Sequence, residues 1–509
     1  MKILNYFSNI TGRKAVFIII LIACFHFINS LIVLETNKFY SNPDESVTGI
    51  LDMLCSFGQE YNLVRLVDKP NPVSEIFSGF IDYWKPPFYF LTALPFLYFI
   101  YDINLFICIL NFFISLITLL SVYGIVSKLI SKQAGLFATF ILSLCPVFFT
   151  MHRTFFIETM LATTLSLSLY VIISHRDDIK LSGFQLVFVL ALGLLTKEQF
   201  YIYMPVLLAF AVFYGKSLNI KNFTKILLLF FIATALAHLA WYYYLPNNIF
   251  VHLLNFSKIK DVPDYLFYFK DFYFFSLTPV VFIFWIIATI FFVVKKKNYI
   301  WISAPLFILF LFSLSTNKVT RHIFPVIIFI PIIITLFIYE LKNIILKKSI
   351  IIFLITLMLF QFFLINYSSL RCYREKNFND FNQFGALSFA FYVPESETYG
   401  HKYNMLRKIL CKYSIQKTAF IHVFIPIVYN FLTLQKDRNS NIVDAFTYES
   451  FDDLIGNINS YTHIVISDKN MDLFSKFDDW SSKNRNFKKT QKINWHINLN
   501  HNDTIWLYQ

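Results

Sequence analysis

Two adjacent acids, Asp44 and Glu45, follow the first long apolar run of a chain whose apolar runs contain few charges. A carboxylate beside an attacking hydroxyl can remove its proton, while a second carboxylate positions the acceptor or tunes the first. An acid pair in a loop is also typical of a solvated turn, and Pro43 favours that alternative. The pair therefore predicts a general base only if other polar residues gather around it.

Basic side chains recur near the ends of other apolar runs. Lys85 precedes two prolines, which suit a helix start because the first turn does not use their missing N–H groups. Lys197 interrupts an apolar stretch, and Lys318 and Arg321 are three residues apart, on one face if the segment is helical. Such cations suit a phosphate, which arginine binds as a fork and lysine as a point charge. The alternatives are an interfacial anchor for Lys85 and a snorkelling side chain for Lys197.

A further acid, Glu158, lies near the end of an apolar run, five residues after Arg153. Ionisable groups near membrane depth are rare and need partners. Either the two side chains form a structural salt bridge, or Glu158 completes a catalytic cavity. His322 is expected to pack at the membrane interface rather than bind metal, and no cysteine spacing predicts a zinc site. No particular cofactor is predicted, and the sequence neither indicates nor excludes a divalent cation.

The composition predicts a polytopic α-helical membrane protein. Of the 509 residues, 57% are hydrophobic and only 15% are charged, with a mean hydropathy of +0.57. The net charge of +13 comes mostly from cations that flank apolar runs, so membrane orientation explains it better than nucleic-acid binding does.

About eleven apolar runs are near the length of a spanning helix. They cover residues 15–34, 104–127, 134–151, 155–174, 182–196, 200–215, 223–245, 273–294, 299–316, 322–340 and 349–366. The shorter apolar stretch 86–101 is expected to lie in the outer leaflet. With the N-terminus cytoplasmic, the inner connections carry sixteen Lys and Arg residues and the outer short ones seven, although Lys258 and Lys260 oppose the rule. This topology places all the polar clusters described above on the outer face.

Two domains are expected. Residues 1–366 form the membrane domain, with a long first outer loop at 35–85, and residues 367–509 form an extracytoplasmic α/β domain of ordinary soluble composition. Strand-like runs occur at 419–425, 462–466 and 504–508. If this tail is extracytoplasmic, Cys372 and Cys411 are candidates for a disulfide, which the sequence leaves open.

Taken in order, the motifs resemble those of the GT-C glycosyltransferases, nearest to the group of protein O-mannosyltransferases and lipid A aminoarabinose transferases. The resemblance covers roughly residues 10–370. It rests on Asp44-Glu45, Lys85-Pro86-Pro87-Phe88-Tyr89, Arg153 followed by Glu158, Gly193-Leu194-Leu195-Thr196-Lys197, Ala240-Trp241-Tyr242 and residues 315–325, which contain Lys318, Arg321 and His322.

The resemblance implies an integral-membrane enzyme that uses a polyprenyl-phosphate sugar at the outer face. It implies that Asp44 is the catalytic base, that Lys85 lies next to the donor phosphate, and that the Lys318/Arg321 segment lines the same cavity. This sequence departs from the family pattern at four positions. These are Trp84 for His or Glu, which counts against a metal there, Glu158 for Asp, Glu198 for Gly and His322 for Tyr.

The expected reaction is transfer of a sugar, with inversion, to a lipid, glycan or protein acceptor. Asp44, Glu45 and Glu158 are the candidate catalytic acids. Candidate phosphate ligands and further cavity residues are Lys85, Lys197, Lys318, Arg321, Arg153, Trp241, Tyr242 and His322. One alternative is a polysaccharide polymerase or ligase with the same donor chemistry. The other is a transporter or flippase, although the sequence shows neither an inverted repeat nor paired broken helices.

Overall fold

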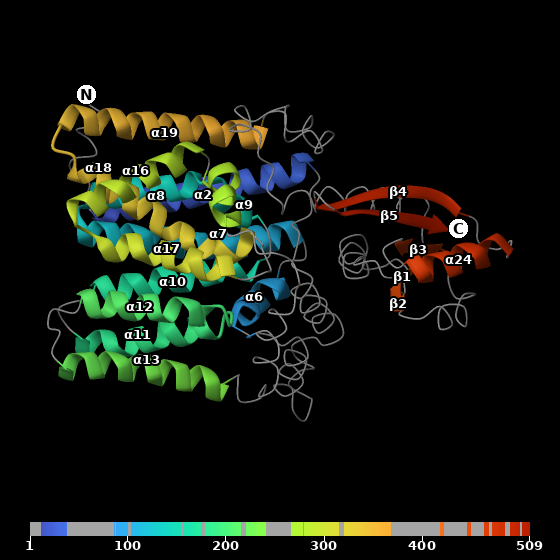
Figure 1. Cartoon of the computed structure of the whole chain (residues 1–509), viewed down its shortest axis with the longest axis horizontal. Helices are drawn as coiled ribbons and strands as arrows, with labels where there is room; N and C mark the ends of the chain where they lie inside the picture. Colours follow the sequence, from blue (N-terminus) through green and yellow to red (C-terminus); the bar gives the residue numbers. More distant parts are fainter. Residues whose placement is uncertain are drawn as a thin grey trace.

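The computed structural model describes two parts of the chain. The first comprises residues 12–37, 86, 88–99, 103–153, 156–174, 179–214, 220–240, 266–277, 279–314 and 320–367, and the second comprises five strands and a helix between residues 418 and 508. The first part is a bundle of roughly parallel and antiparallel helices, and the strands lie beyond one end of it (Figure 1). Helices α2 (Gly12–Asn37) and α19 (Ile344–Tyr367) both finish at this end, here called the tail-side end.

Between these two helices the bundle contains regular and irregular elements. In chain order they are α6 (Phe88–Phe99), α7 (Ile103–Leu129), α8 (Lys132–Leu144), α9 (Pro146–Met151), α10 (Ile157–Ser174), α11 (Ile179–Leu194), α12 (Phe200–Tyr214), α13 (Ile220–Ala240), α15 (Phe267–Asp271), the π-helix η2 (Phe272–Ser276), α16 (Pro279–Lys295), α17 (Tyr299–Leu314), the 3₁₀-helix η3 (Thr320–Ile328) and α18 (Phe329–Glu340).

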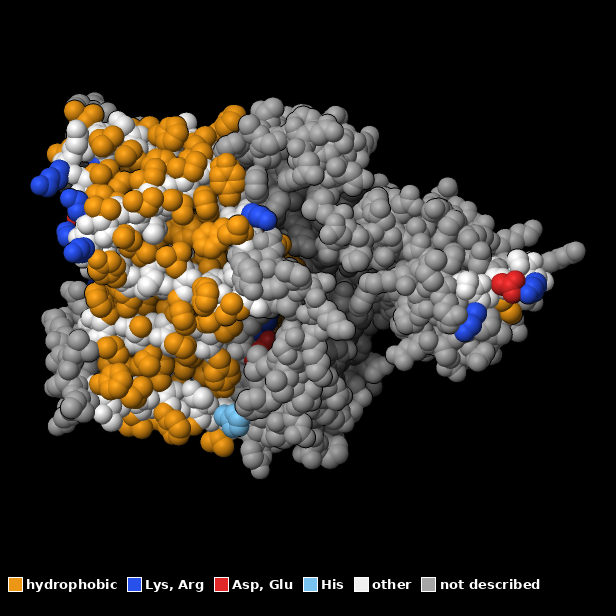
Figure 2. Space-filling model, in the orientation of Figure 1, with side chains coloured by type: hydrophobic (Ala, Val, Ile, Leu, Met, Phe, Trp, Pro, Cys, Tyr) orange, Lys and Arg blue, Asp and Glu red, His pale blue; other side chains and the backbone are white. Residues whose placement is uncertain are grey.

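The chain is an integral membrane protein. Six helical segments are long and apolar enough to cross a membrane, namely Gly12–Val33, Leu105–Leu129, Ile157–Ser174, Phe223–Ala240, Arg321–Glu340 and Ile344–Phe363. Five shorter apolar helices lie at the other expected spans, and large hydrophobic side chains cover much of the face of the bundle that Figure 2 shows. The number of eleven spans stays a prediction. Helix α6 has 12 residues, about 18 Å, which is too short to cross the hydrocarbon core.

The core of the bundle is organised around α10 and α18. Almost all side chains of both helices are buried, and α10 packs against α7, α11, α12 and η3. Hydrogen bonds between helices supplement apolar packing. The Thr118 and Thr163 hydroxyls join α7 to α10 at 2.7 Å, and the Trp301 indole donates to the Tyr214 hydroxyl at 2.7 Å. Such bonds suit a bundle in lipid, where hydrophobicity alone does not hold helices together.

The prediction of one continuous helix over 134–151 is wrong. Cys145 is extended, with ψ 129°, and α9 starts afresh at Pro146. Proline disfavours helical geometry in the residue before it and lacks the N–H that a continuing helix requires. Likewise, Pro325 lies within the 3₁₀-helix η3, which precedes the regular helix α18. These irregular segments neighbour one another, since α9 packs against both η2 and η3.

The C-terminal strands form a mixed five-stranded sheet in the order β2-β1-β3-β5-β4. Its elements are β1 (Thr418–Ile421), β2 (Ala445–Tyr448), β3 (His463–Ser467), β4 (Lys489–Asn498), β5 (His501–Tyr508) and the helix α24 (Met471–Lys483). Strand β1 pairs in parallel with β2 and β3, whereas β5 is antiparallel to β3 and β4. The three strand-like runs of the sequence overlap β1, β3 and β5. The limits of a separate domain at 367–509, and the pairing of Cys372 with Cys411, stay predictions because they concern residues outside those described.

Helix α8 packs closely on α7 at Gly135, which leaves no room there for a larger side chain. A Cβ atom at Gly135 would lie 2.7 Å from the Tyr123 carbonyl oxygen and nearer still to the Ser127 hydroxyl. We expect Gly135→Ala to destabilise the protein by about 1–3 kcal/mol, the usual range for overpacking. At Gly183, in α11, a Cβ atom would meet only the Leu229 side chain, at 3.4 Å. Gly183→Ala should therefore be neutral or stabilising, because alanine favours the helix. Thermal unfolding in detergent compares the two, and equal shifts would contradict this packing.

Candidate functional site

A buried cluster of three charged side chains lies at the tail-side end of the bundle. The Lys197 ammonium donates to Glu158 Oε1 at 2.6 Å, and the Arg321 Nε atom lies 3.8 Å from the same oxygen. The Glu158 side chain has no exposed surface and the Lys197 side chain is 6% exposed, whereas that of Arg321 is 29% exposed. The structure thus brings together three residues that the sequence proposed separately, from three distant segments.

Local structure explains how each side chain reaches the cluster. Glu158 lies in the first turn of α10, where the helix dipole favours an acid. Lys197 sits in the tight turn between α11 and α12, and its N–H donates to the Gly193 carbonyl. Gly193 is required there because a Cβ atom would collide with the Phe200 ring. Arg321 lies in the first turn of η3, with its guanidinium 5.4 Å from the centre of the Phe156 ring.

The cluster carries two cations and one anion. An isolated charge is strongly disfavoured in an apolar bundle, so Glu158 and Lys197 each make the burial of the other tolerable. The second cation, Arg321, keeps part of its side chain exposed. Counted over these three described side chains, the cluster has one positive charge in excess, at its more accessible side. Such a charge attracts an anion, and a guanidinium is well shaped for a phosphate.

The motif around Lys85 approaches this cluster through the backbone. The Phe88 N–H, at the start of α6, donates to the Leu195 carbonyl at 3.0 Å, two residues from Lys197. Pro86 is buried, and Tyr89 is fully buried with its hydroxyl close to Thr159 and Glu158. Phe88 and Tyr89, from the motif that follows Lys85, therefore lie beside the motif 193–197 at the tail-side end. Lys85 itself lies outside the described residues.

Arg153 binds Asn366 and not Glu158, the partner that its position in the sequence suggests. Its guanidinium donates to the Asn366 side-chain oxygen and lies 5.1 Å from the centre of the Phe149 ring. Among the described residues, the ion-pair partners of Glu158 are Lys197 and Arg321 instead. Arg153 is only 2% exposed, so it connects the segment before α10 to the end of α19 within the protein interior. The salt bridge between Arg153 and Glu158 is therefore not found.

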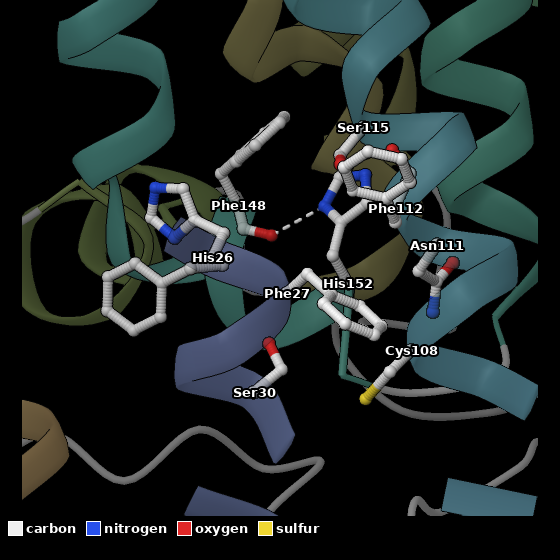
Figure 3. A pocket seen from close by; sticks show the side chains of 10 residues that line it. His26, Phe27, Ser30, Cys108, Asn111, Phe112, Ser115, Phe148 and His152 are labelled. Carbon is white, nitrogen blue, oxygen red and sulfur yellow. Dashed lines mark hydrogen bonds between the residues drawn. The ribbon is translucent and has the colours of Figure 1, made fainter. Parts of the chain in front are cut away.

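A small pocket with both aromatic and polar lining residues lies beside Arg153, between α2, α7 and α9 (Figure 3). Its lining includes His26, Phe27, Ser30, Cys108, Asn111, Phe112, Ser115, Phe148, Phe149 and His152. His152 Nδ1 is 2.7 Å from the Phe148 carbonyl oxygen, whereas neither ring nitrogen of His26 has a hydrogen-bond partner among the described residues. The His152 ring also packs against Phe324 in η3, with centroids 5.9 Å apart. The pocket and the charged cluster thus adjoin the same 3₁₀-helix.

His322 packs against an aromatic side chain. Its ring stacks on Phe312 with centroids 6.3 Å apart, and its backbone carbonyl accepts a hydrogen bond of 3.4 Å from the Tyr203 hydroxyl. Within the described part of the chain, no three His, Cys, Asp or Glu side chains lie close enough together to hold a metal ion.

Several predicted site residues lie outside the described residues, so their roles stay predictions. They are Asp44, Glu45, Lys85, Lys318, Trp241 and Tyr242.

Two buried polar residues at this end escaped the sequence reasoning. Asn366 binds Arg153 as described, and Asp271, 2% exposed, accepts a hydrogen bond from the Ser276 hydroxyl across the π-helix η2. Each had a weak signal in the sequence, namely a polar residue at the end of an apolar run and an acid within the aromatic segment 267–275. Neither signal indicates a partner.

Comparisons with known proteins give the class of the fold. Residues 85–241 match the family described as Dolichyl-phosphate-mannose-protein mannosyltransferase. The structure of ArnT from Cupriavidus metallidurans bound to undecaprenyl phosphate aligns with a TM-score of 0.55 and 11% identity, over 98% of each chain. The apo ArnT structure aligns with a TM-score of 0.50 and 12% identity, over 95% of this chain and 97% of that one. No curated protein sequence gives a match.

The resemblance to the GT-C glycosyltransferases is therefore confirmed. The chain shares the fold of ArnT over almost its full length, and its segment from Lys85 to Trp241 carries the mannosyltransferase family pattern. The matched segment contains Arg153, Glu158 and Lys197, so two members of the charged cluster lie within it.

Breaking the buried ion pair should be costly. We expect Glu158→Gln to destabilise the protein by about 3–5 kcal/mol, because Lys197 would remain buried without its counter-charge. The double variant Glu158→Gln/Lys197→Met should recover part of this loss. Glu340→Gln is the matched control, since Glu340 pairs with Lys297 at 3.3 Å with side chains 41% and 57% exposed. It should change stability by about 1 kcal/mol or less. Unfolding in detergent without donor measures all three, and a Glu158→Gln effect no larger than the control would contradict the assignment.

Proposed function

We propose that this chain is a membrane glycosyltransferase that takes its sugar from a polyprenyl-phosphate donor at the tail-side end of the bundle. The observation that carries the proposal is the buried cluster of Glu158, Lys197 and Arg321 with its excess positive charge. The family match at 85–241 and the fold shared with ArnT, which was solved with undecaprenyl phosphate, support this donor class.

The charge of the cluster fits the charge of such a donor. A sugar linked to a polyprenyl phosphate is a phosphodiester with one negative charge. Glu158 neutralises one cation of the cluster, and the partly exposed Arg321 supplies the remaining charge. We assign Arg321 the main phosphate contact among the described residues. Lys85 and Lys318 are proposed as further ligands because their sequence motifs adjoin Lys197 and Arg321.

Glu158 is proposed as a positioning residue. Its carboxylate has no exposed surface and is shared by two cations, so an acceptor hydroxyl does not reach it in this arrangement. Its function would be to fix the direction of the Lys197 and Arg321 side chains. Such fixed charges stabilise developing charge effectively, because they need no reorganisation during the reaction.

Asp44 is proposed as the base, on the strength of the sequence resemblance, with Glu45 beside it. The acceptor oxygen attacks the anomeric carbon as Asp44 takes its proton. The bond between that carbon and the phosphate oxygen breaks, and the polyprenyl phosphate leaves with the electron pair. One displacement of this kind inverts the anomeric configuration.

The proposed orientation places the tail-side end outside the cytoplasm. Lysines gather at the opposite end of the bundle. Figure 2 shows basic side chains there, just beyond the edge of the hydrophobic surface. Positively charged connections favour the cytoplasmic side. The N-terminus would then be cytoplasmic, and the sheet beyond the bundle extracytoplasmic.

Replacing the base should remove turnover without removing binding. We expect Asp44→Asn to lower kcat by a factor of about 10²–10⁴, the usual contribution of a general base, with donor affinity largely unchanged. Membranes incubated with a panel of radiolabelled polyprenyl-phosphate sugars identify the sugar that moves, and the best donor then serves for kinetics. Asp52→Asn, in the same loop, is the control that should retain activity. Full activity of Asp44→Asn would remove Asp44 from the role of base, whereas transfer of no label by the wild type would refute the proposed function.

Arg321 should act on donor binding. We expect Arg321→Gln to raise KM for the donor by roughly 10–150-fold, the equivalent of one hydrogen bond to a charged group. Arg321→Lys keeps the charge but loses the fork, so its KM should lie between those of the wild type and Arg321→Gln. Steady-state kinetics at several donor concentrations, with a melting curve for each variant, test this. An unchanged KM in a folded Arg321→Gln protein would exclude the phosphate contact.

A further inference from the structure

Two neighbouring turns at the end of the bundle opposite the cluster concentrate positive charge. One joins α16 to α17, and the other joins α18 to α19. Together they carry six lysines and, among the described residues there, one acid, Glu340. The lysines are Lys295, Lys296, Lys297, Lys342, Lys347 and Lys348. We call them the lysine turns.

Side-chain contacts join the lysine turns to each other. The Lys297 ammonium lies 3.3 Å from Glu340 Oε2, which links the two turns directly. The Lys347 ammonium donates to the Tyr339 carbonyl at 3.2 Å and lies 4.8 Å from the centre of its ring. Below them, the Phe291 and Phe337 rings pack with centroids 5.1 Å apart. The lysines therefore form one surface.

Most of this charge is not neutralised within the described part of the chain. Lys295, Lys296, Lys342 and Lys348 are exposed and make no ion pair with any described residue. The backbone also holds Lys296 and Asn298 in the left-handed region, at φ 52° and 53°, a conformation that asparagine tolerates but that is unfavourable for lysine. Repulsion among these neighbouring cations is reduced if an anion binds there.

Large aliphatic side chains adjoin these lysines. Val294 is 72% exposed at the end of α16, and Ile344 and Ile345 are 65% and 77% exposed at the start of α19. Exposed apolar groups directly beside cations match a molecule with an anionic head and hydrocarbon chains. Figure 2 shows the basic side chains at the edge of the hydrophobic band on this end.

We propose that the lysine turns bind the headgroup of an anionic phospholipid of the phosphatidylglycerol type, with its acyl chains along Val294, Ile344 and Ile345. General orientation of the protein requires only a surplus of cations at this end. A lipid site requires more, namely phosphate contacts that depend on these particular lysines. Removing these lysines, and not others at the same end, should therefore abolish binding of the lipid.

The test uses the full chain in nanodiscs of phosphatidylcholine, with or without phosphatidylglycerol. We expect phosphatidylglycerol to raise the melting temperature of the wild type and to remain bound in native mass spectrometry. In the variant Lys295→Gln/Lys296→Gln/Lys348→Gln this gain should vanish. Each lysine near an anionic surface contributes roughly a fivefold factor in affinity, so the loss should be on the order of a hundredfold. Melting in phosphatidylcholine alone shows that the variant folds.

The matched control is Lys128→Gln/Lys132→Gln/Lys225→Gln, which removes three exposed lysines from the last turn of α7, the first turn of α8 and near the start of α13, at the same end. It should keep the gain from phosphatidylglycerol. Equal losses in the two triple variants would show a general attraction between charges and would overturn the site, as would an unchanged gain in the first variant. Glycerol phosphate without acyl chains should give no gain. If it did, the aliphatic contacts would be excluded.

Discussion

The need to neutralise a carboxylate in an apolar bundle organises the tail-side end. Glu158 has no exposed surface, so nearby cations have to replace the water that it has lost. It obtains them from two segments far away in the chain, the turn that holds Lys197 and the 3₁₀-helix that holds Arg321. Satisfying one buried charge therefore fixes the relative positions of α10, the connection from α11 to α12, and η3. The backbone bond from Phe88 to Leu195 adds α6 to the same arrangement.

Irregular backbone segments allow polar side chains to converge at the tail-side end. Three segments at this end, α9, η2 and η3, depart from a continuous α-helix. Within a membrane, such departures are tolerated where the freed backbone groups are buried in protein or face a polar cavity. Here α9 ends at the small pocket lined by His26 and His152, and η3 carries Arg321. The breaks thus let short stretches of chain turn their polar residues inward, which a straight helix in lipid would leave facing hydrocarbon.

The sequence predicted the apolar helices well, because hydrocarbon thickness imposes a length that hydropathy reveals. It failed at the break before Pro146, where an apolar run long enough to span conceals two helices. It also named Glu158, Lys197 and Arg321 as polar groups on one face without pairing them. Hydropathy gives depth in the membrane, but not which helices are neighbours. For the same reason Arg153 was considered with the nearby Glu158, whereas its partner Asn366 lies 213 residues away.

If the proposed function holds, the net charge of the cluster matches the charge of the intact donor better than the charge of the departing polyprenyl phosphate. The donor phosphodiester carries one negative charge, which the one excess positive charge of Glu158, Lys197 and Arg321 balances. The departing polyprenyl phosphate is a monoester and gains a second charge as the sugar leaves. Catalysis requires interactions that strengthen as that charge develops. At least one further cation should therefore act late in the transfer, and Lys85 and Lys318, whose motifs adjoin Lys197 and Arg321, are the residues that the sequence offers for it.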